Sequence, residues 1–563
     1  MGWLGYHGVF SCGVAILWVF SYFMWWEIYR CWVMDVIDIG SFLTWVELGN
    51  GVVINMGYNC DLIGCLVMVI MGCGSLIVVS VVYVEMWDDK EGGNFMILLL
   101  LFLVMMGVMV SSSNLVVFYL GWEGIGLVSL FLINYWSERV RSVKAAVKVF
   151  CINKVGDACI LFGICIIIGK VGTSELGELE GLVSILCHLE VVIGSYSVGL
   201  IHMLGIIFVI GGGVKSAQFG FHIWLLEAME APLGASALMH SSTLVIAGIV
   251  LVYKMYFIVG MSWIALWYMS VWGSWTAVFA AFCACWQFEL KIVLAYSTIS
   301  SMGFMYLMLG LGAISEVLLY LIIHAFIKIF LFLVVGLIMW QCNGMQDVRW
   351  MGGLINYMCF YYICYCWGVI GLVGLPYWTG YMGKSVMWVY VMSGHINNTG
   401  IVGCLLGANI FMIISMYRLG GIIFGGCRGG HRIIYKIVWL SWGIITLMSI
   451  LMWLMAYWGI CWARIIEGSY SNIYMMGMNN RNIINIYLTS NLEHSWYMLS
   501  WVYLIILLVV FHKYISSGLS TTKNLHSYWI SVKWCYLALW LLIGLYANYW
   551  NRRCIRINLN VYF

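Results

Sequence analysis

The chain has 563 residues, of which 64% are apolar and only 9% are charged. Soluble proteins carry roughly 25% charged residues, so this composition excludes a soluble globular protein and indicates a polytopic membrane protein. The near-neutral net charge of +3 also argues against a nucleic-acid partner, which would require a strongly basic surface.

The cysteines do not form the pattern of a disulfide framework or a metal site. Most of the 20 cysteines lie within apolar stretches, where Cys behaves as a small apolar side chain. No C-x-x-C pair occurs, so we expect no iron–sulfur cluster or zinc bound by this chain. The chain begins on an apolar stretch without a basic segment or an A-x-A site, so we expect no cleaved signal peptide.

About sixteen apolar segments follow one another, each near the roughly 20 residues that cross a bilayer. They are continuous rather than alternating, which predicts helices and not a membrane β-barrel. We expect an all-α polytopic membrane helix bundle of about 14–16 transmembrane helices. The approximate centres of the segments are Val14, a weak one near Val46, Ile70, Leu103, Gly124, Leu161, Ile210, Ala247, Ala277, Ile299, Ala325, Gly371, Gly407, Ile445, Leu507 and Leu539.

Residues 120–157 form two apolar helices that flank a short charged turn, and each helix carries ionisable residues. Glu123 lies mid-way along the first helix, while Lys154 and Asp157 lie three residues apart, on one face of the second. A charge at the centre of a bilayer costs at least a few kcal/mol. Two interpretations stay open: a polar path inside a membrane bundle, or an ion pair that only holds helices together.

A second polar region follows three glycines in the segment around Ile210. Lys215 lies deep in this span, and Ser216, Gln218 and Gly220 next to it predict a broken helix. Pro232 stands just before the next helix, where proline is tolerated.

His240 is about two turns into the helix that follows Pro232. It is followed by three hydroxyl side chains, which we expect to supply its hydrogen-bond partners: Ser241, Ser242 and Thr243. A lone histidine inside a membrane is often structural. The hydroxyl side chains and the buried Lys215 favour a proton relay instead.

Two further lysines lie downstream. Lys291 is close to the start of a span, so it either extends to the membrane interface or has a function. His324 and Lys328 are four residues apart, and Tyr320 is one turn earlier, so these three side chains lie along one stripe of a helix. A buried His–Lys stripe is a candidate path for protons.

Pro376, Gly380 and Gly383 interrupt another apolar run, and Lys384 follows the break. A broken helix with a lysine occurs around Lys215 as well, which indicates two related halves. Inverted repeats with discontinuous helices are a common transporter architecture. We expect N-terminal helices in residues 1–94, two inverted five-helix repeats in residues 95–258 and 262–424, and C-terminal helices in residues 425–563.

At these residues the chain resembles the subunit 5 family of NADH dehydrogenase, the distal antiporter-like membrane subunits of respiratory complex I. The Gly-Trp-Glu-Gly version of the first motif separates this family from the paralogous subunits 2 and 4. The matching stretches are LGWEGIGLVS (120–129), INKVGD (152–157), VKSAQFGFHIWL (214–225), EAPLGASALMHSSTLVIAG (230–248), LKIVLAYSTIS (290–300), HAFIKIFLF (324–332), QDVRWMGGL (346–354), GLPYWTGYMGKS (374–385) and MYRLGGIIFG (416–425).

The resemblance implies a central axis of protonatable side chains at mid-membrane. It assigns Glu123 as the partner of Lys215, and Asp157 as a second acidic position. Lys384 is the terminal lysine of this axis. The connecting relay consists of His240, His324 and Lys328.

The resemblance also implies the cellular context. It predicts a subunit of the proton-pumping NADH:ubiquinone oxidoreductase in the mitochondrial inner membrane, in contact with lipid and with other membrane-arm subunits, especially the subunit 4 paralogue. FMN, iron–sulfur clusters and ubiquinone are expected in other subunits, because this chain has no Gly-rich strand–turn–helix fingerprint and is expected to bind no cofactor. Quinone reduction elsewhere would drive charge changes along the axis.

Several positions depart from the family pattern. Lys154 stands where Arg is usual, which keeps the charge but loses the bidentate fork. Tyr320 replaces a second His and Gly220 replaces a Pro, while Leu-Gly follows Pro232 in place of Thr-Pro and Ser385 replaces an acid. Residues 512–527, between the last two expected spans, are too few for the family's long lateral helix at roughly 1.5 Å per residue. We therefore expect this helix to be short, absent or supplied by another chain.

Two alternative functions compete with this one. A subunit of a multi-subunit cation/proton antiporter shares these lysines, but the Gly-Trp-Glu-Gly motif favours complex I. A haem-carrying cytochrome needs histidine pairs on facing helices; His188 and His202 have suggestive spacing, but Glu190 and a Gly/Ser-containing bend separate them.

Overall fold

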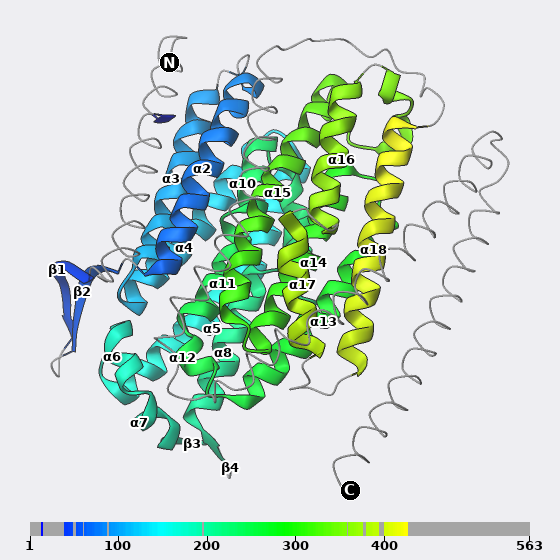
Figure 1. Ribbon diagram of the computed structural model, residues 1–563. Coiled ribbons are helices and arrows are strands. Elements are labelled where there is room, and N and C mark those ends of the chain that lie inside the picture. Colours follow the sequence, from blue (N-terminus) through cyan, green and yellow to red (C-terminus); the bar gives the residue numbers. More distant parts are fainter. Residues whose placement is uncertain are drawn as a thin grey trace, which may run out of the picture.

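The computed structural model of the protein describes residues 13–14, 39–48, 52–59, 61–86, 89, 91–193, 196–356, 358–374, 379–392 and 399–425. They form a bundle of long helices packed side by side, with two short β-hairpins at its margin (Figure 1). Nine helices in the described residues are long and apolar enough to cross a membrane, so the predicted membrane helix bundle is confirmed. The segments expected around Ile445, Leu507 and Leu539, most of the one around Val14, and the region of the lateral helix lie outside the described residues.

The weak span predicted near Val46 is wrong. Strands β1 (Ile39–Leu48) and β2 (Val52–Asn59) pair antiparallel there. The sequence between them contains Asn50-Gly51, which is a strong hairpin signal. Polar residues also recur along the first strand, so this stretch is too polar for a membrane span and instead satisfies its backbone by pairing.

After one long helix, the first half of the bundle has three more long helices, an interrupted helix and a further span made of two shorter helices. In chain order its elements are α2 (Leu62–Glu85), α3 (Gly92–Ser111), α4 (Leu115–Ile133), α5 (Val140–Val171), α6 (Leu176–Gly181), α7 (Val183–His188), β3 (Glu190–Ile193), β4 (Tyr196–Gly199), α8 (Leu200–Lys215), α9 (Ile223–Glu227), η1 (Ala228–Glu230), α10 (Leu233–Ser241), α11 (Leu244–Lys254) and α12 (Tyr256–Val259).

The second half has the same succession. Its elements are α13 (Trp263–Ala284), α14 (Leu290–Gly310), α15 (Ile314–Gln341), η2 (Val348–Trp350), η3 (Leu354–Asn356), α16 (Cys359–Val373), α17 (Thr379–Met392) and α18 (Thr399–Phe424). Three long helices are again followed by an interrupted one, α16–α17, and by a further long helix. The order of long and interrupted spans therefore matches the first half from α3 onward, although α9 is much shorter than α17 and the counterpart of α18 is divided into α10 and α11.

The helices that carry the first polar residues have clear local end signals. Before α4, the side chain of Asn114 accepts a hydrogen bond from the Val116 amide at 2.9 Å, which caps the helix. At the end of α5, Gly172 has φ +81°, a left-handed conformation that glycine adopts without strain. These caps fix the start of α4 and the end of α5.

The centre of the bundle is formed by α10, α11, α14 and α15. The span Leu233–Lys254 is fully buried within the protein and α14 is 94% buried, whereas only 39% of the α5 span is buried. Small residues permit close contact at this centre: a Cβ atom on Gly248 would lie 2.2 Å from the Gly212 carbonyl oxygen, as is common where membrane helices pack closely. Polar side chains on the central helices are therefore shielded from lipid.

The predicted break after Lys215 is present, between α8 and α9. Gly220 has φ +95°, and two indoles donate to backbone carbonyls here: Trp224 to Val214 at 2.8 Å and Trp272 to Phe219 at 3.0 Å. Gln218 is fully buried and its side-chain oxygen accepts from Thr276 at 2.8 Å. Side chains of other helical segments thus satisfy the backbone groups that the break releases, as a lipid environment requires.

The second break separates α16 from α17. Gly374 ends α16 with φ +78°, and a Cβ atom on Gly380 would lie 1.9 Å from the Gly371 carbonyl oxygen. The interruption predicted from the glycines before Lys384 is therefore present. Pro376 lies outside the described residues.

Candidate functional site

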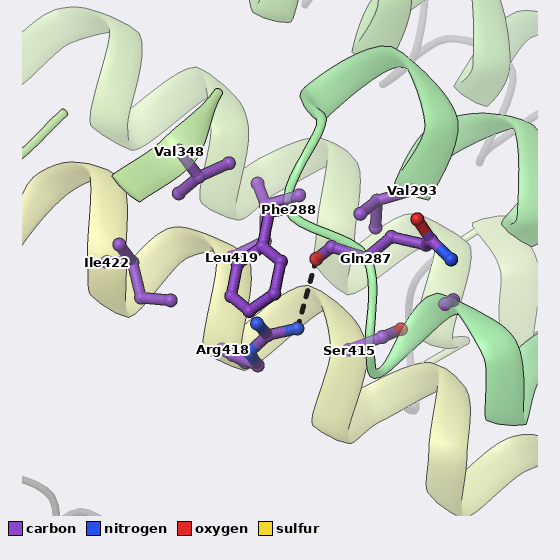
Figure 2. A pocket seen from close by; sticks show the side chains of 9 residues that line it. Gln287, Phe288, Val293, Val348, Ser415, Arg418, Leu419 and Ile422 are labelled. Atoms are coloured by element: carbon purple, nitrogen blue, oxygen red, sulfur yellow. Dashed lines mark hydrogen bonds between the residues drawn. The ribbon is translucent and has the colours of Figure 1, made fainter. Parts of the chain in front are cut away.

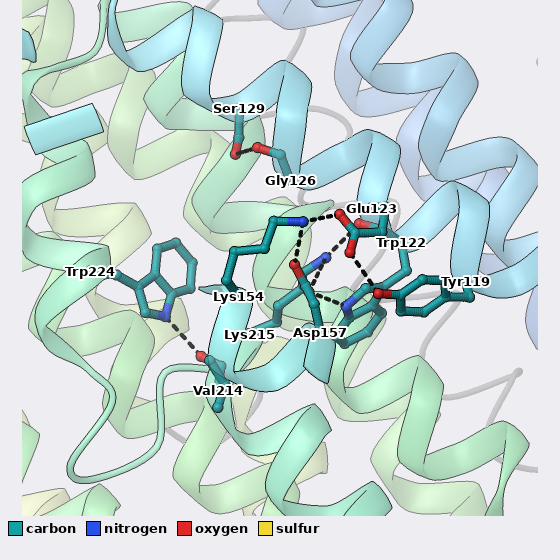
Figure 3. Close-up of polar contacts among 10 residues, drawn as sticks. All are labelled: Tyr119, Trp122, Glu123, Gly126, Ser129, Lys154, Asp157, Val214, Lys215 and Trp224. Carbon is teal, nitrogen blue, oxygen red and sulfur yellow. Dashed lines mark hydrogen bonds and ion pairs between the residues drawn. The ribbon is translucent and has the colours of Figure 1, made fainter. Parts of the chain in front are cut away.

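The first group of predicted site residues comes together where α4, α5 and α8 meet (Figure 3). It contains two carboxylates, Glu123 and Asp157, and two lysines, Lys154 and Lys215. Lys154 Nζ lies 3.3 Å from Asp157 Oδ2 along one face of α5, as the three-residue spacing predicts. We call these four side chains the acidic–lysine cluster.

The pairing within this cluster differs from the sequence-based expectation. Glu123 was expected as the partner of Lys215, but its carboxylate forms an ion pair with Lys154 and accepts a hydrogen bond from the Tyr119 hydroxyl at 2.6 Å. Lys215 Nζ instead lies 3.8 Å from Asp157 Oδ1. The reason is geometric: Lys154 projects from α5 toward α4 and takes up the Glu123 carboxylate, while Asp157, one turn further on, faces α8.

Lys215 is held by a residue that the sequence analysis did not single out. Its ammonium donates to the Trp122 carbonyl at 2.6 Å and lies 3.9 Å from the centre of the Trp122 ring. The same indole donates to Asp157 Oδ1 at 2.7 Å. Trp122 therefore bridges the buried ion pair, and its position next to Glu123 in the Gly-Trp-Glu-Gly motif was the available signal.

The two ion pairs differ in exposure. The side chains of Lys215 and Asp157 are 0% and 3% exposed, whereas those of Lys154 and Glu123 are 38% and 23% exposed. One pair is therefore enclosed by the bundle, and the other lies at its outer surface on α4 and α5.

The two histidines lie in the buried interior of the bundle. The imidazole of His240 on α10 lies 6.0 Å from the ring of Phe332, centre to centre, and His324 is on α15. None of the four ring nitrogens has a hydrogen-bond partner within the described part of the chain. Buried polar groups usually have a partner, including ordered water. Neither imidazole is therefore held by a side chain of the described residues.

The expected hydroxyl partners of His240 do not bind it. Ser241 Oγ donates to the Ala237 carbonyl, and Thr243 Oγ1 donates to the Leu238 carbonyl at 2.9 Å. Ser and Thr inside helices commonly bond to the backbone one turn earlier. These side chains stabilise the interruption between α10 and α11, so their predicted role as partners of His240 is wrong.

The second group of predicted residues contains Lys328 on α15 and Lys384 on α17, which we call the lysine pair. Lys328 donates to Ser297 Oγ and to the Leu294 carbonyl at 3.3 Å. Lys384 donates to the Val373 carbonyl at 3.2 Å, at the C-terminal end of α16, where the helix dipole favours a cation. Both side chains are buried, and the helices that carry them, α15 and α17, pack against each other.

The side chain of Lys291 is buried among protein segments and is not directed away from the bundle. It is 7% exposed, and its ammonium donates to the carbonyls of Met229 and Ala231 at 3.3 and 3.1 Å. It therefore anchors the connection that leads into α10, and it is within electrostatic range of His240. The sequence left this choice open because depth cannot be read from the span boundary alone.

A small cavity lies apart from these groups, between α18 and the segment before α14 (Figure 2). Arg418 fills much of its polar side: its guanidinium donates to the Gln287 carbonyl at 3.1 Å and lies 4.7 Å from the centre of the Phe288 ring. As far as the described residues go, its lining includes none of the eight predicted site residues. We interpret it as a packing feature that attaches α18 to the bundle.

The fold and the buried residues together define a class of protein. Interrupted helices, each with a lysine at the break, and a series of buried acids, lysines and histidines between them are typical of membrane transporters of the antiporter type. The family comparison agrees: residues 112–410 match the model of the NADH:quinone oxidoreductase/Mrp antiporter transmembrane family. The chain belongs to this family.

Curated relatives give the same assignment, and a solved structure shares the fold. The chain is 32% identical over 346 residues to NADH-ubiquinone oxidoreductase chain 5 of Dictyostelium discoideum, covering 61% of this chain and 51% of the relative. It is 30% identical over 421 residues to chain 5 of Chondrus crispus, covering 74% and 63%. The Mrp complex of Dietzia sp. DQ12-45-1b contains a chain of the same fold, with TM-score 0.71, 20% identity, and coverage of 95% of this chain and 58% of that one. The chain thus spans about half to under two thirds of the length of these two relatives.

Proposed function

We propose that this chain is a proton-translocating membrane-arm subunit of NADH:ubiquinone oxidoreductase, with no redox centre of its own. The observation that carries the proposal is the acidic–lysine cluster, in which a fully buried Lys215 is paired with Asp157 at 3.8 Å. Identity to relatives named NADH-ubiquinone oxidoreductase chain 5 supports the assignment to this complex.

The geometry indicates how the cluster would move a proton. Opposite unit charges about 4 Å apart interact by roughly 4 kcal/mol at an effective dielectric constant near 20. Lys154 contacts both Glu123 and Asp157. A movement of its ammonium therefore changes how far Asp157 is neutralised, and so how strongly Asp157 attracts Lys215. When this attraction weakens, the buried Lys215 releases its proton toward the interior of the bundle.

The interior holds the groups that would receive this proton. His240, His324 and Lys328 are buried, with open ring nitrogens on both histidines. Lys384 lies on α17, which packs against the helix that carries Lys328, so we infer that a proton that arrives on one lysine favours release from the other. Lys384 is the terminal group in this scheme. Redox chemistry elsewhere in the complex, at FMN, iron–sulfur clusters and ubiquinone, would supply the energy.

The exposed ion pair supports a protein neighbour. Glu123 and Lys154 are 23% and 38% exposed on the outer surface of α4 and α5, where contact with lipid would cost several kcal/mol. A neighbouring membrane-arm subunit, for which we propose the subunit 4 paralogue, would cover this pair. We propose the mitochondrial inner membrane as the location of this assembly.

The repeated succession of elements supports two related transport units. Three long helices, an interrupted helix and a further span occur twice, which agrees with the units expected in residues 95–258 and 262–424. Each unit then contributes one lysine at a helix break, Lys215 in the first and Lys384 in the second. We infer that the two units act in series.

The proposal is tested with Lys215→Met in membrane vesicles that contain the assembled complex. We expect NADH-driven proton uptake to be lost or greatly reduced while the complex still assembles, because Met fills a similar volume but carries no proton. Lys144→Met is the matched control, since Lys144 is an exposed lysine on α5. Normal proton uptake by the Lys215 variant would refute the role assigned to this lysine.

A second candidate is a subunit of a multi-subunit cation/proton antiporter. The shared fold with the Mrp complex of Dietzia favours it. The two functions differ in their driving force, so the same vesicles decide between them. Proton flux driven by NADH supports the complex I subunit, and flux driven only by a sodium gradient supports the antiporter.

A further inference from the structure

A titratable residue outside the predicted axis lies on the same helix as His324 and Lys328. On α15, Glu316, Tyr320, His324 and Lys328 follow one another at intervals of four residues, so each contacts the next turn on one side of the helix. The distance along the helix from Glu316 to Lys328 is roughly 18 Å at 1.5 Å per residue. This is close to half the roughly 30 Å thickness of the bilayer core.

Helix α17 packs along this stripe in the opposite direction. The Tyr390 hydroxyl donates to Glu316 Oε1 at 2.9 Å, and a Cβ atom on Gly383 would lie 2.4 Å from Tyr320 Cδ2. Lys384 follows Gly383 directly. The seam between α15 and α17 therefore has the lysine pair at its inner end and Glu316 with Tyr390 at its outer end.

Glu316 has one oxygen that no neighbour in the described residues satisfies. Oε1 accepts from Tyr390, whereas Oε2 is buried without a hydrogen-bond partner. The residue itself is partly exposed. Tyr390 thus holds one carboxylate oxygen and the other is enclosed and unsatisfied, while the residue lies in the first turn of α15 and is partly exposed, so it is placed to pass a proton between the interior of the bundle and the outside.

We propose that Glu316 is the proton-exchange residue at the mouth of a path that connects the lysine pair with the membrane face at which α15 begins. The proposal rests on the proposed function. Protons pass between this carboxylate and Lys328 along Tyr320 and His324, with α17 closing the other side of the seam.

The competing explanation is that Glu316 only attaches α15 to α17 through its bond to Tyr390. Two substitutions separate these roles. In Glu316→Gln the amide oxygen still accepts the Tyr390 hydrogen bond, but the side chain no longer titrates. In Tyr390→Phe the hydrogen bond is lost, but the carboxylate remains.

A control carboxylate is present at the same end of the bundle. The Tyr256 hydroxyl on α12 donates to the Leu309 carbonyl, just before the turn into α15, at 3.3 Å. Both α12 and α6 are at the lower end of the bundle in Figure 1. Glu178 on α6 is exposed. Glu178→Gln therefore removes one carboxylate from this membrane face without touching the seam.

The experiment measures NADH oxidation and proton uptake in vesicles that contain the assembled complex with the full-length chain. For Glu316→Gln we expect proton uptake per NADH to fall roughly tenfold, a modest loss for a positioned proton-transfer group. Tyr390→Phe and Glu178→Gln should stay near the unmodified chain. In Glu316→Ala, added formate should restore uptake, because a small diffusible acid replaces the missing carboxyl.

Two results would overturn the proposal. The first is normal proton uptake by Glu316→Gln. The second is a loss of uptake in Tyr390→Phe as large as that in Glu316→Gln, together with no rescue of Glu316→Ala by formate, because the contact would then be purely structural. Lys215→Met in the same vesicles reports separately on the proposed function. If Lys215→Met loses proton uptake and Glu316→Gln keeps it, the proposed function stands and only the present inference is wrong. If Lys215→Met pumps normally and Glu316→Gln does not, the path through Lys215 is wrong and the mouth at Glu316 stands.

Discussion

The acidic–lysine cluster and the lysine pair handle buried charge in opposite ways. The first balances two lysines with two carboxylates, and a tryptophan links them. In the second, Lys328 and Lys384 bind a hydroxyl and backbone carbonyls, Lys384 also lies over the Phe304 ring, and no carboxylate of the described residues is ion-paired with either lysine. An unpaired buried ammonium costs several kcal/mol. The comparison shows that the side chains of the first cluster can all stay charged. The lysine pair instead favours the neutral form, so it tends to release protons.

The largest effect that this comparison predicts is that of Asp157→Asn. It leaves Lys215 buried with Lys154 nearby and only Glu123 to balance them. Removing one member of a buried ion pair destabilises a protein by about 3–5 kcal/mol. We expect less assembled complex on a native gel, and little proton uptake from what remains. Normal amounts of complex would show that the Lys215–Asp157 contact is not a stabilising pair.

Lys328→Met should separate stability from transport. No ion pair of the described residues is broken by this substitution, and a buried ammonium is replaced by an apolar group of similar length, so we expect stability within about 1 kcal/mol of the unmodified chain. Proton uptake should nevertheless be lost. Thermal unfolding and NADH-driven uptake measure the two properties. A loss of stability as large as that of Asp157→Asn would mean that Lys328 has a counter-charge and that the two clusters are alike.

The smallest effect is expected from an ion pair outside the membrane spans. Asp347 accepts from Arg349 Nε at 3.0 Å, and the Arg349 guanidinium lowers the pKa of this carboxyl from its usual value. Asp347→Asn should cost under about 1 kcal/mol, as for most exposed pairs.

The sign of the pH dependence follows from the lowered pKa of Asp347. The contribution is complete at a pH above the ordinary Asp pKa and disappears as the pH falls through the lowered value. Thermal unfolding of the solubilised complex at several pH values checks this. A difference between Asp347→Asn and the unmodified chain that grows on acidification would contradict it.

The sequence was sufficient to predict the helical bundle, both breaks and the burial of the ionisable residues other than Glu123 and Lys154, which are partly exposed. Ionisable residues inside apolar runs are costly, so Lys215, His324 and Lys384 stand out in the sequence alone. Glycines near the lysines predicted the interruptions for a similar physical reason, since glycine tolerates the left-handed backbone found at Gly220, after Lys215; Gly374, which ends α16 in the same conformation, was not singled out.

The partners of these residues could not be predicted in the same way. Whether Glu123 meets Lys154 or Lys215 depends on where α4, α5 and α8 meet, and spacing within one helix does not contain that information. The hydroxyls after His240 were assigned to the imidazole although backbone carbonyls one turn earlier compete for them. Glu316 was overlooked because it lies near a helix end, where carboxylates are common, although its four-residue spacing from Tyr320 was visible.

The partly exposed pair of Glu123 and Lys154 also affects the stability of the chain before it is assembled into a complex. A newly inserted copy without its neighbour presents both charges to lipid, at the level of an otherwise apolar wall on α4 and α5. Such a surface marks an incomplete protein, because lipid cannot solvate it and membrane proteases can reach it. We therefore expect the abundance of this chain to follow that of the subunit that covers the pair, so that surplus copies are removed rather than stored.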